Sequence, residues 1–162
     1  MFKSSAALFV TLSLVSGLCS ARDISHIEFA VNPSQLQGAG RLNFWGFHVY
    51  DATLYRAGNS SSPEFALDIQ YQRSFSGSAI ANRTADEMKK IGVSETQAAI
   101  WGKELASVLP NIEPGQTLTG VYSPKVGTTL FYEGKKLPKF QGLIFQKRFL
   151  EFGSILKPAY PS

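Results

Sequence analysis

Cysteine and histidine are scarce in this chain. Its 162 residues include one cysteine, Cys19, and two histidines, His26 and His48. No segment has the H-E-x-x-H pattern or the clustered Cys and His residues of a zinc site. The sequence therefore predicts no metal site. If Cys19 is removed with the N-terminal leader described below, the remaining chain forms no disulfide and depends on its hydrophobic core.

Sequence motifs of the common enzyme classes are also missing. There is no G-x-S-x-G nucleophile elbow, so a hydrolytic triad is not predicted. There is no phosphate-binding loop, and the short run Gly38-Ala39-Gly40 begins a strand-like segment instead of a helix. We therefore expect no nucleotide cofactor, nor any other cofactor.

The charges do not indicate nucleic-acid binding. Sixteen lysines and arginines against twelve aspartates and glutamates give a net charge of +4, or +3 without Lys3. The cations are scattered, and the densest group is Lys135, Lys136 and Lys139. A basic stripe interleaved with aromatic residues is missing, so no nucleic-acid partner is predicted.

The only long apolar run is at the N-terminus. Lys3 precedes the run Ala6–Val15, and small residues follow up to Ala21. This pattern is typical of a secretory signal peptide, and the run is too short for a stable membrane span. We expect residues 1–21 to be a signal peptide and residues 22–162 to form one domain, periplasmic or secreted after cleavage near Ala21.

The most informative segment is Phe65–Gly92. Apolar residues first alternate along a predicted strand that runs through Phe75, and the strand's other face, including Asp68, is polar. Arg73 continues the apolar face and would need a carboxylate such as Glu87, a bound anion or a route to solvent. The period then changes to that of a helix capped by Ser78 and ended by Gly92.

The other segments complete an α+β pattern. We predict a strand at 27–31, a central, covered hairpin at 36–55 that turns near Gly46, and a helix that begins with a Ser94/Gln97 capping box. The apolar stripe of that helix consists of Ile100, Trp101, Leu105, Val108 and Leu109. Further strands are expected at Thr117–Tyr122 and Thr128–Tyr132, and helical spacing at Phe140–Phe152. This order predicts an antiparallel sheet with helices layered on one face.

Four strand residues are the candidate ligand-binding residues: Arg41, Tyr50, Tyr71 and Arg73. The guanidinium of arginine matches the geometry of a carboxylate, and tyrosine combines a hydroxyl donor with an apolar ring. Such a set suits an anionic head group whose apolar remainder occupies a cavity. The alternative is structural: Tyr50 and Tyr71 would then be ordinary core aromatics.

Two stretches, GAGRLNFWGFHVYDATLY and FALDIQYQRSFSGSAIANRTADEM, resemble the chalcone isomerase-like family, specifically its short exported bacterial branch. The resemblance extends from about Leu36 to about Phe152. It implies an open-faced β-sandwich, in which helices are layered on one antiparallel sheet.

The resemblance does not extend to the catalytic set of plant chalcone isomerases. Their arginine matches Arg41, but their threonine, tyrosine and asparagine match Tyr50, Ile80 and Glu87. Ile80 cannot donate a hydrogen bond to a developing negative charge. Arginine with tyrosine resembles instead the non-catalytic, fatty-acid-binding members of the family, in which this pair holds a carboxylate.

The sequence thus favours a non-catalytic protein that binds a small amphipathic anion such as a fatty acid. Arg41 and Tyr50 would hold the head group, with Tyr71 and Arg73 as further candidates. One alternative is an isomerase or lyase for a phenolic or enone substrate, with Arg41 stabilising an oxyanion and Tyr50 as the acid. Another is a module that binds a protein of the cell envelope.

Overall fold

The computed structural model describes residues 23–58 and 62–139. A short 3-10 helix, η1 (Ser25–Ile27), comes first. The strands are β1 (Ser34–Phe44), β2 (Phe47–Ala57), β3 (Phe65–Tyr71), β4 (Thr117–Ser123), β5 (Gly127–Tyr132) and β6 (Lys135–Lys136), and the helices are α1 (Gly77–Lys90) and α2 (Glu95–Val108). The proposed leader and the predicted helix at Phe140–Phe152 lie outside the described residues.

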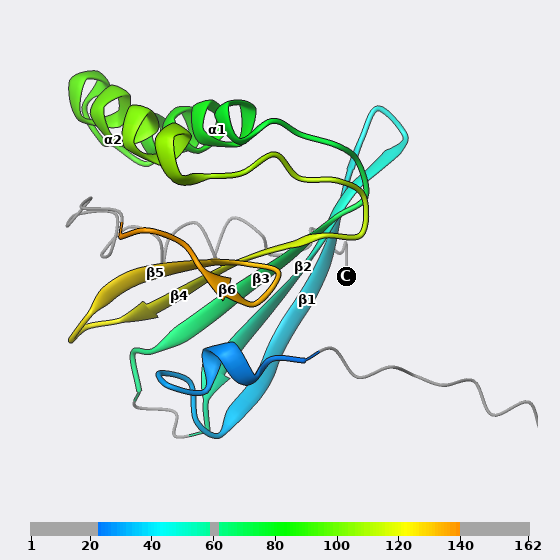
Figure 1. Ribbon diagram of the computed structural model, residues 1–162, viewed down its shortest axis with the longest axis vertical. Helices are drawn as coiled ribbons and strands as arrows, with labels where there is room; N and C mark the ends of the chain where they lie inside the picture. The colour runs from blue at the N-terminus through cyan, green and yellow to red at the C-terminus, as the bar shows by residue number, and fades with distance from the viewer. Residues whose placement is uncertain (1–22, 59–61, 140–162) are drawn as a thin grey trace, which may run out of the picture.

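The six strands form one antiparallel sheet in sequence order, with β1 and β6 at its edges. Both helices are inserted between β3 and β4 and lie over the same face of the sheet (Figure 1). This arrangement confirms the predicted α+β class. No helix within the described ranges is long and apolar enough to cross a membrane.

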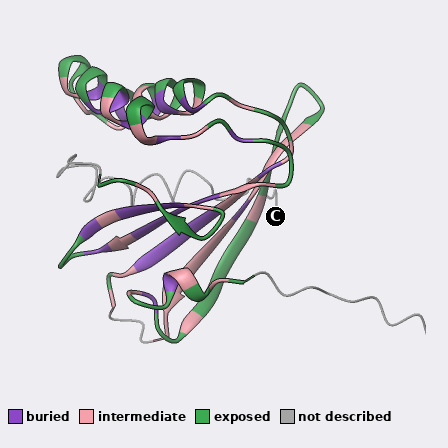
Figure 2. Ribbon diagram, in the orientation of Figure 1, coloured by how far each residue is buried: buried purple, intermediate pink, exposed green. Residues whose placement is uncertain are grey.

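The main hydrophobic core lies between the helices and the sheet. Its buried members include Met88 from α1, Trp101 and Leu105 from α2, and Tyr71 and Leu118 from the sheet. Figure 2 shows the buried residues on the inner helix faces and on the central strands, whereas β1 is largely exposed. The prediction of Trp101 as a core residue is therefore confirmed.

Both helices begin with serine caps. The Ser94 side chain accepts a hydrogen bond from the backbone N–H of Gln97, as predicted. In α1 the cap is Ser76, which accepts from the N–H of Ala79, so the prediction of Ser78 was two residues late. Pro110 follows the end of α2 closely.

A second, smaller core lies on the other face of the sheet. Ile27 and Val31 are fully buried there against Val121 and Phe131. The predicted strand at 27–31 is wrong: the chain forms η1 followed by a turn, and the backbone N–H of Val31 donates to the carbonyl of Ile27. The two buried side chains are thus four residues apart, a helical spacing.

Buried polar groups also hold this N-terminal segment on the sheet. The Thr119 hydroxyl donates to Asp68 Oδ1 at 2.8 Å, and its oxygen lies 3.1 Å from Nε2 of His26. Because the hydroxyl proton points to Asp68, His26 acts as the donor in this contact. Asp68 was predicted on a wet face but is buried, because the N-terminal segment covers that side of β3.

The hairpin of β1 and β2 turns at Trp45-Gly46, which confirms the predicted turn. Its position in the sheet was predicted wrongly. β1 is an edge strand whose residues are mostly exposed, and it pairs with β2 alone. The mixed apolar and polar pattern of residues 36–44 therefore belongs to an uncovered edge and not to a buried centre.

Candidate functional site

The pairing of β1 with β2 separates Arg41 from Tyr50. Arg41 is paired with Asp51, whereas Leu42 is paired with Tyr50. Neighbouring residues of a strand point to opposite faces, so Arg41 and Tyr50 lie on different faces of the sheet. The predicted head-group pair is therefore wrong: these two side chains do not meet around one ligand.

The two tyrosines do meet, under the helices. The ring centroids of Tyr50 and Tyr71 are 5.9 Å apart with an interplanar angle of 64°, and the Phe75 ring lies edge-on to Tyr71 at 5.6 Å. Burial raises the pKa of both phenols; at Tyr50, the charge of Arg83 opposes this rise and that of Glu87 adds to it. Both hydroxyls therefore stay protonated at neutral pH. Their core role agrees with the structural alternative.

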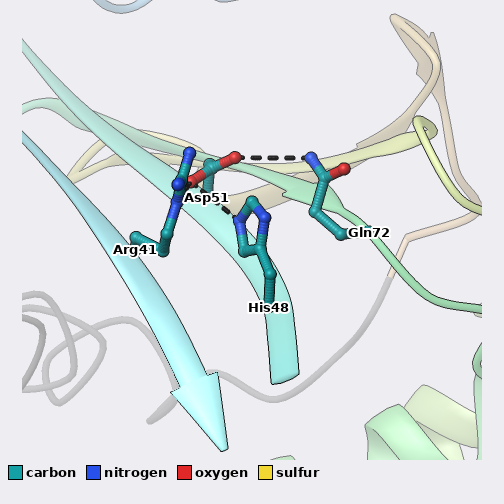
Figure 3. A network of polar contacts seen from close by, with 4 residues as sticks. All are labelled: Arg41, His48, Asp51 and Gln72. Atoms are coloured by element: carbon teal, nitrogen blue, oxygen red, sulfur yellow. Dashed lines mark hydrogen bonds and ion pairs between the residues drawn. The ribbon is translucent and has the colours of Figure 1, made fainter. Parts of the chain in front are cut away.

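Asp51 organises a polar network on the opposite face, near the hairpin turn (Figure 3). Arg41 Nε donates to Asp51 Oδ1 at 2.9 Å, and His48 Nε2 lies 3.0 Å from the same oxygen. Gln72 Nε2 donates to Oδ2 at 3.3 Å. Burial raises the pKa of Asp51, but the hydrogen bonds and positive charges of Arg41 and His48 outweigh it, so the pKa is lowered overall.

Arg73 lies beyond the end of β3 and is exposed. The prediction that it continues the buried face is wrong, because the strand stops at Tyr71 before the period reaches it. Its guanidinium carbon lies 4.4 Å from the centroid of the Phe47 ring, a cation–π distance. The predicted alternative of a bond to Glu87 is also wrong: Glu87 pairs with Arg83 and Lys90.

An open pocket lies beside this arginine. Its volume is about 670 Å³, and it is lined by His48, Gln72, Arg73, Ser74, Phe75 and Pro114. Among the described residues no carboxylate forms an ion pair with Arg73. The pocket thus combines Arg73, one aromatic wall and the polar side chains of Gln72 and Ser74, which donate to Asp51 and Glu113.

The part of the chain that the structure describes contains no candidate metal site. Within residues 23–58 and 62–139, no group of three or more His, Cys, Asp or Glu side chains is arranged to hold a metal ion. His48 and Asp51 are only two such groups, and Arg41 and Gln72 occupy the carboxylate.

Of the four predicted residues, only Arg73 lines the pocket. The sequence did not indicate His48 or Gln72, which follows the end of a strand, as residues of this site. His48 lies at the irregular pairing after Leu42, which is opposite Tyr50, while Asn43 is opposite His48. Gln72 follows the regular pairing of β3 with β2, and its backbone N–H donates to the carbonyl of Val49. An irregularity of this kind has no clear signal in one sequence, although Gly46 predicted the nearby turn.

Comparison with known proteins adds no assignment. No protein-family model matches the chain, and a search of curated proteins returned no match. The resemblance to the chalcone isomerase-like family therefore stays a prediction from the sequence motifs.

Proposed function

We propose that this protein is an exported, non-catalytic member of the chalcone isomerase-like family that binds a small amphipathic anion such as a fatty acid. Support comes from the family-like motifs together with the antiparallel sheet and its layer of two helices. The finer assignment as an open-faced β-sandwich of that family is part of the same proposal.

The observation that carries the binding role is the setting of Arg73. This arginine is stacked on Phe47, lines the pocket and has no carboxylate partner among the described residues. The planar guanidinium offers two parallel N–H donors that match a carboxylate, and its carbon lies 4.4 Å from the centroid of the Phe47 ring. Ser74 and Gln72 add further polar groups.

The volume of the pocket suits this class of ligand. Sites for small molecules commonly measure about 300 to 1,000 Å³, and this pocket of about 670 Å³ falls within the range. Phe75 supplies an apolar wall at its side. The head group would contact Arg73, and the apolar part would lie against Phe75.

The enzyme alternative requires Arg41 and Tyr50 to act on one substrate. These side chains lie on opposite faces, and Arg41 is already paired with Asp51. Ile80, on α1, has no polar side-chain atom to offer. The geometry thus favours binding over this form of catalysis.

The binding proposal is tested with dodecanoate at concentrations below those at which it forms micelles. We expect the Arg73→Gln variant to bind it at least about tenfold more weakly in isothermal titration calorimetry, because a charge-assisted hydrogen bond is lost. Arg56→Gln is the matched control, since Arg56 lies over the Phe65 ring at 6.0 Å but outside the pocket.

Equal affinity of the Arg73→Gln variant and the unchanged protein would refute the assignment of the head-group site. Equal weakening by both substitutions would show a general effect of charge, which also contradicts it.

A further inference from the structure

Three aromatic side chains are exposed together at the end of the β1–β2 hairpin. Trp45 is 85% exposed, Phe44 66% and Phe47 57%. We call residues Phe44–Phe47 the hairpin tip. Large apolar side chains grouped on a surface commonly mark a binding site, and the proposed anion pocket does not require Phe44 or Trp45.

The backbone keeps these side chains away from the core. Trp45 and Gly46 have positive φ angles of 51° and 77°, as in the tight two-residue turns that suit the twist of a hairpin. Figure 1 shows the tip projecting beyond the sheet and the helices. The rings of Phe44 and Trp45 lie 6.2 Å apart, so they present one apolar surface.

The small size of this surface argues against a protein partner. A stable protein–protein interface commonly uses roughly 20–30 residues on each side, whereas the tip is a convex turn with three large apolar side chains. Shallow insertion at a bilayer surface needs far fewer residues, because Trp and Phe side chains are stabilised where the lipid acyl chains meet the hydrated head groups.

The surrounding charges are compatible with phospholipid head groups. Arg41 and Asp51 neutralise each other. Glu113, on a neighbouring loop, carries a negative charge and accepts a hydrogen bond from Ser74. Arg73 lies directly against Phe47, and the chain without Lys3 of the proposed leader carries a net charge of +3.

We infer that the hairpin tip docks on membranes that contain anionic phospholipids by inserting Phe44 and Trp45 at the interface. Arg73, behind them, lies at the level of the lipid phosphates. This inference goes beyond the anion-binding proposal and does not depend on it.

The test uses the protein purified after export, with its N-terminus established by mass spectrometry. It is mixed with vesicles of 70% phosphatidylcholine and 30% phosphatidylglycerol and then sedimented. We expect the double variant Phe44→Ser/Trp45→Ser to lose at least about tenfold in vesicle affinity, because two apolar side chains no longer leave water. Phe29→Ser is the matched control, since Phe29 is 58% exposed but lies outside the tip.

Tryptophan fluorescence identifies the inserted residue. Trp101 is buried, so an emission shift to shorter wavelength on adding vesicles is expected from Trp45 and should disappear in Trp45→Phe. Brominated lipids should quench the same signal. Circular dichroism checks that each variant remains folded.

Vesicle binding that the double variant retains in full would overturn the inference, as would absence of binding by the unchanged protein. Dimerisation that is lost in the double variant, without vesicle binding, would show a protein interface instead. Dodecanoate binding without vesicles is measured separately, so failure here leaves the anion site standing.

Discussion

Thr119 and Thr128 lie on adjacent strands, but their hydroxyls have different surroundings. The Thr119 hydroxyl is buried and connects Asp68 with His26. The buried oxygen of Thr128 has no hydrogen-bond partner among the described residues. The threonine hydroxyl therefore contributes to stability at position 119, whereas at position 128 its burial costs desolvation energy that no hydrogen bond offsets.

We expect Thr119→Val to lower the free energy of unfolding by about 1–3 kcal/mol, because buried polar groups lose a partner. Thr128→Val, the matched control, should be neutral or slightly stabilising. Urea denaturation at pH 7 measures both. Equal losses in the two variants would contradict the proposed difference between these hydroxyls.

Asp51 should make stability depend on pH. Its pKa is lowered in the folded protein because Arg41 and His48 outweigh the effect of burial. A lowered pKa stabilises the fold at pH values above the unfolded pKa of about 4. This stabilisation is lost as the pH falls through the lower, folded pKa.

We therefore expect the unchanged protein to be more stable than Asp51→Asn at pH 5 and this advantage to shrink as the pH falls below about 4. Because the network is partly exposed, the loss should be at most about 1 kcal/mol. Urea denaturation over this pH range measures it. In an Arg41→Gln background the change should be smaller, and an unchanged pH dependence there would contradict the role of Arg41.

At the scale of elements, the start of α1 is in close contact with the connection that follows α2. A Cβ atom placed on Gly77 would lie 2.1 Å from the carbonyl oxygen of Leu109 and 2.9 Å from that of Pro110. The Gly77 N–H also donates to Asn111 Oδ1 at 3.1 Å. The backbone contact, not flexibility, therefore requires glycine here.

Gly77→Ala should destabilise the protein by about 1–3 kcal/mol, because backbone atoms must move apart. Helix propensity alone predicts the opposite sign, since alanine is favoured over glycine in helices. Thermal unfolding followed by circular dichroism tests this. Gly38→Ala is the control: its Cβ meets nothing within 4 Å, and a midpoint lowered as much as in Gly77→Ala would contradict the explanation.

At the scale of the whole molecule, the described residues form a single sheet whose central strands have a hydrophobic core on each face, whereas β1 is largely exposed. The N-terminal segment from residue 23 covers one face, and its Ile27 is fully buried there. The proposed cleavage after Ala21 would leave this segment intact. Export processing and folding are thus compatible at this position.

The mature protein isolated from the cell envelope should have an intact mass that corresponds to residues 22–162. This outcome follows from the cation, apolar run and small residues of the leader. Replacing the apolar residues Leu12 and Leu14 by arginine should leave the full-length chain in the cytoplasm. A full-length mass in the envelope fraction of the unchanged protein would contradict the cleavage.

The elements were predictable where local patterns are strong. The Ser94 cap, the turn at Gly46 and the order of the hairpin, the next strand and the two helices follow from residue types at short range. The prediction that Arg41 and Tyr50 form a pair failed because the strand register decides which residues share a face of the sheet. One irregularity in the pairing changes which residues those are. The prediction that Arg73 continues the buried face failed because an alternating pattern of apolar residues does not show where a strand ends.

The sequence by itself determined the α+β class, both helices and the antiparallel order, since these depend on periodicity, caps and turns within a few residues of each other. Only the tertiary structure decided that β1 is an exposed edge, that Asp68 is buried and that Arg73 meets Phe47 beside a pocket. Each of these depends on contacts between residues distant in the chain. Such contacts are set by register and by which segment covers which face, and local patterns do not encode them.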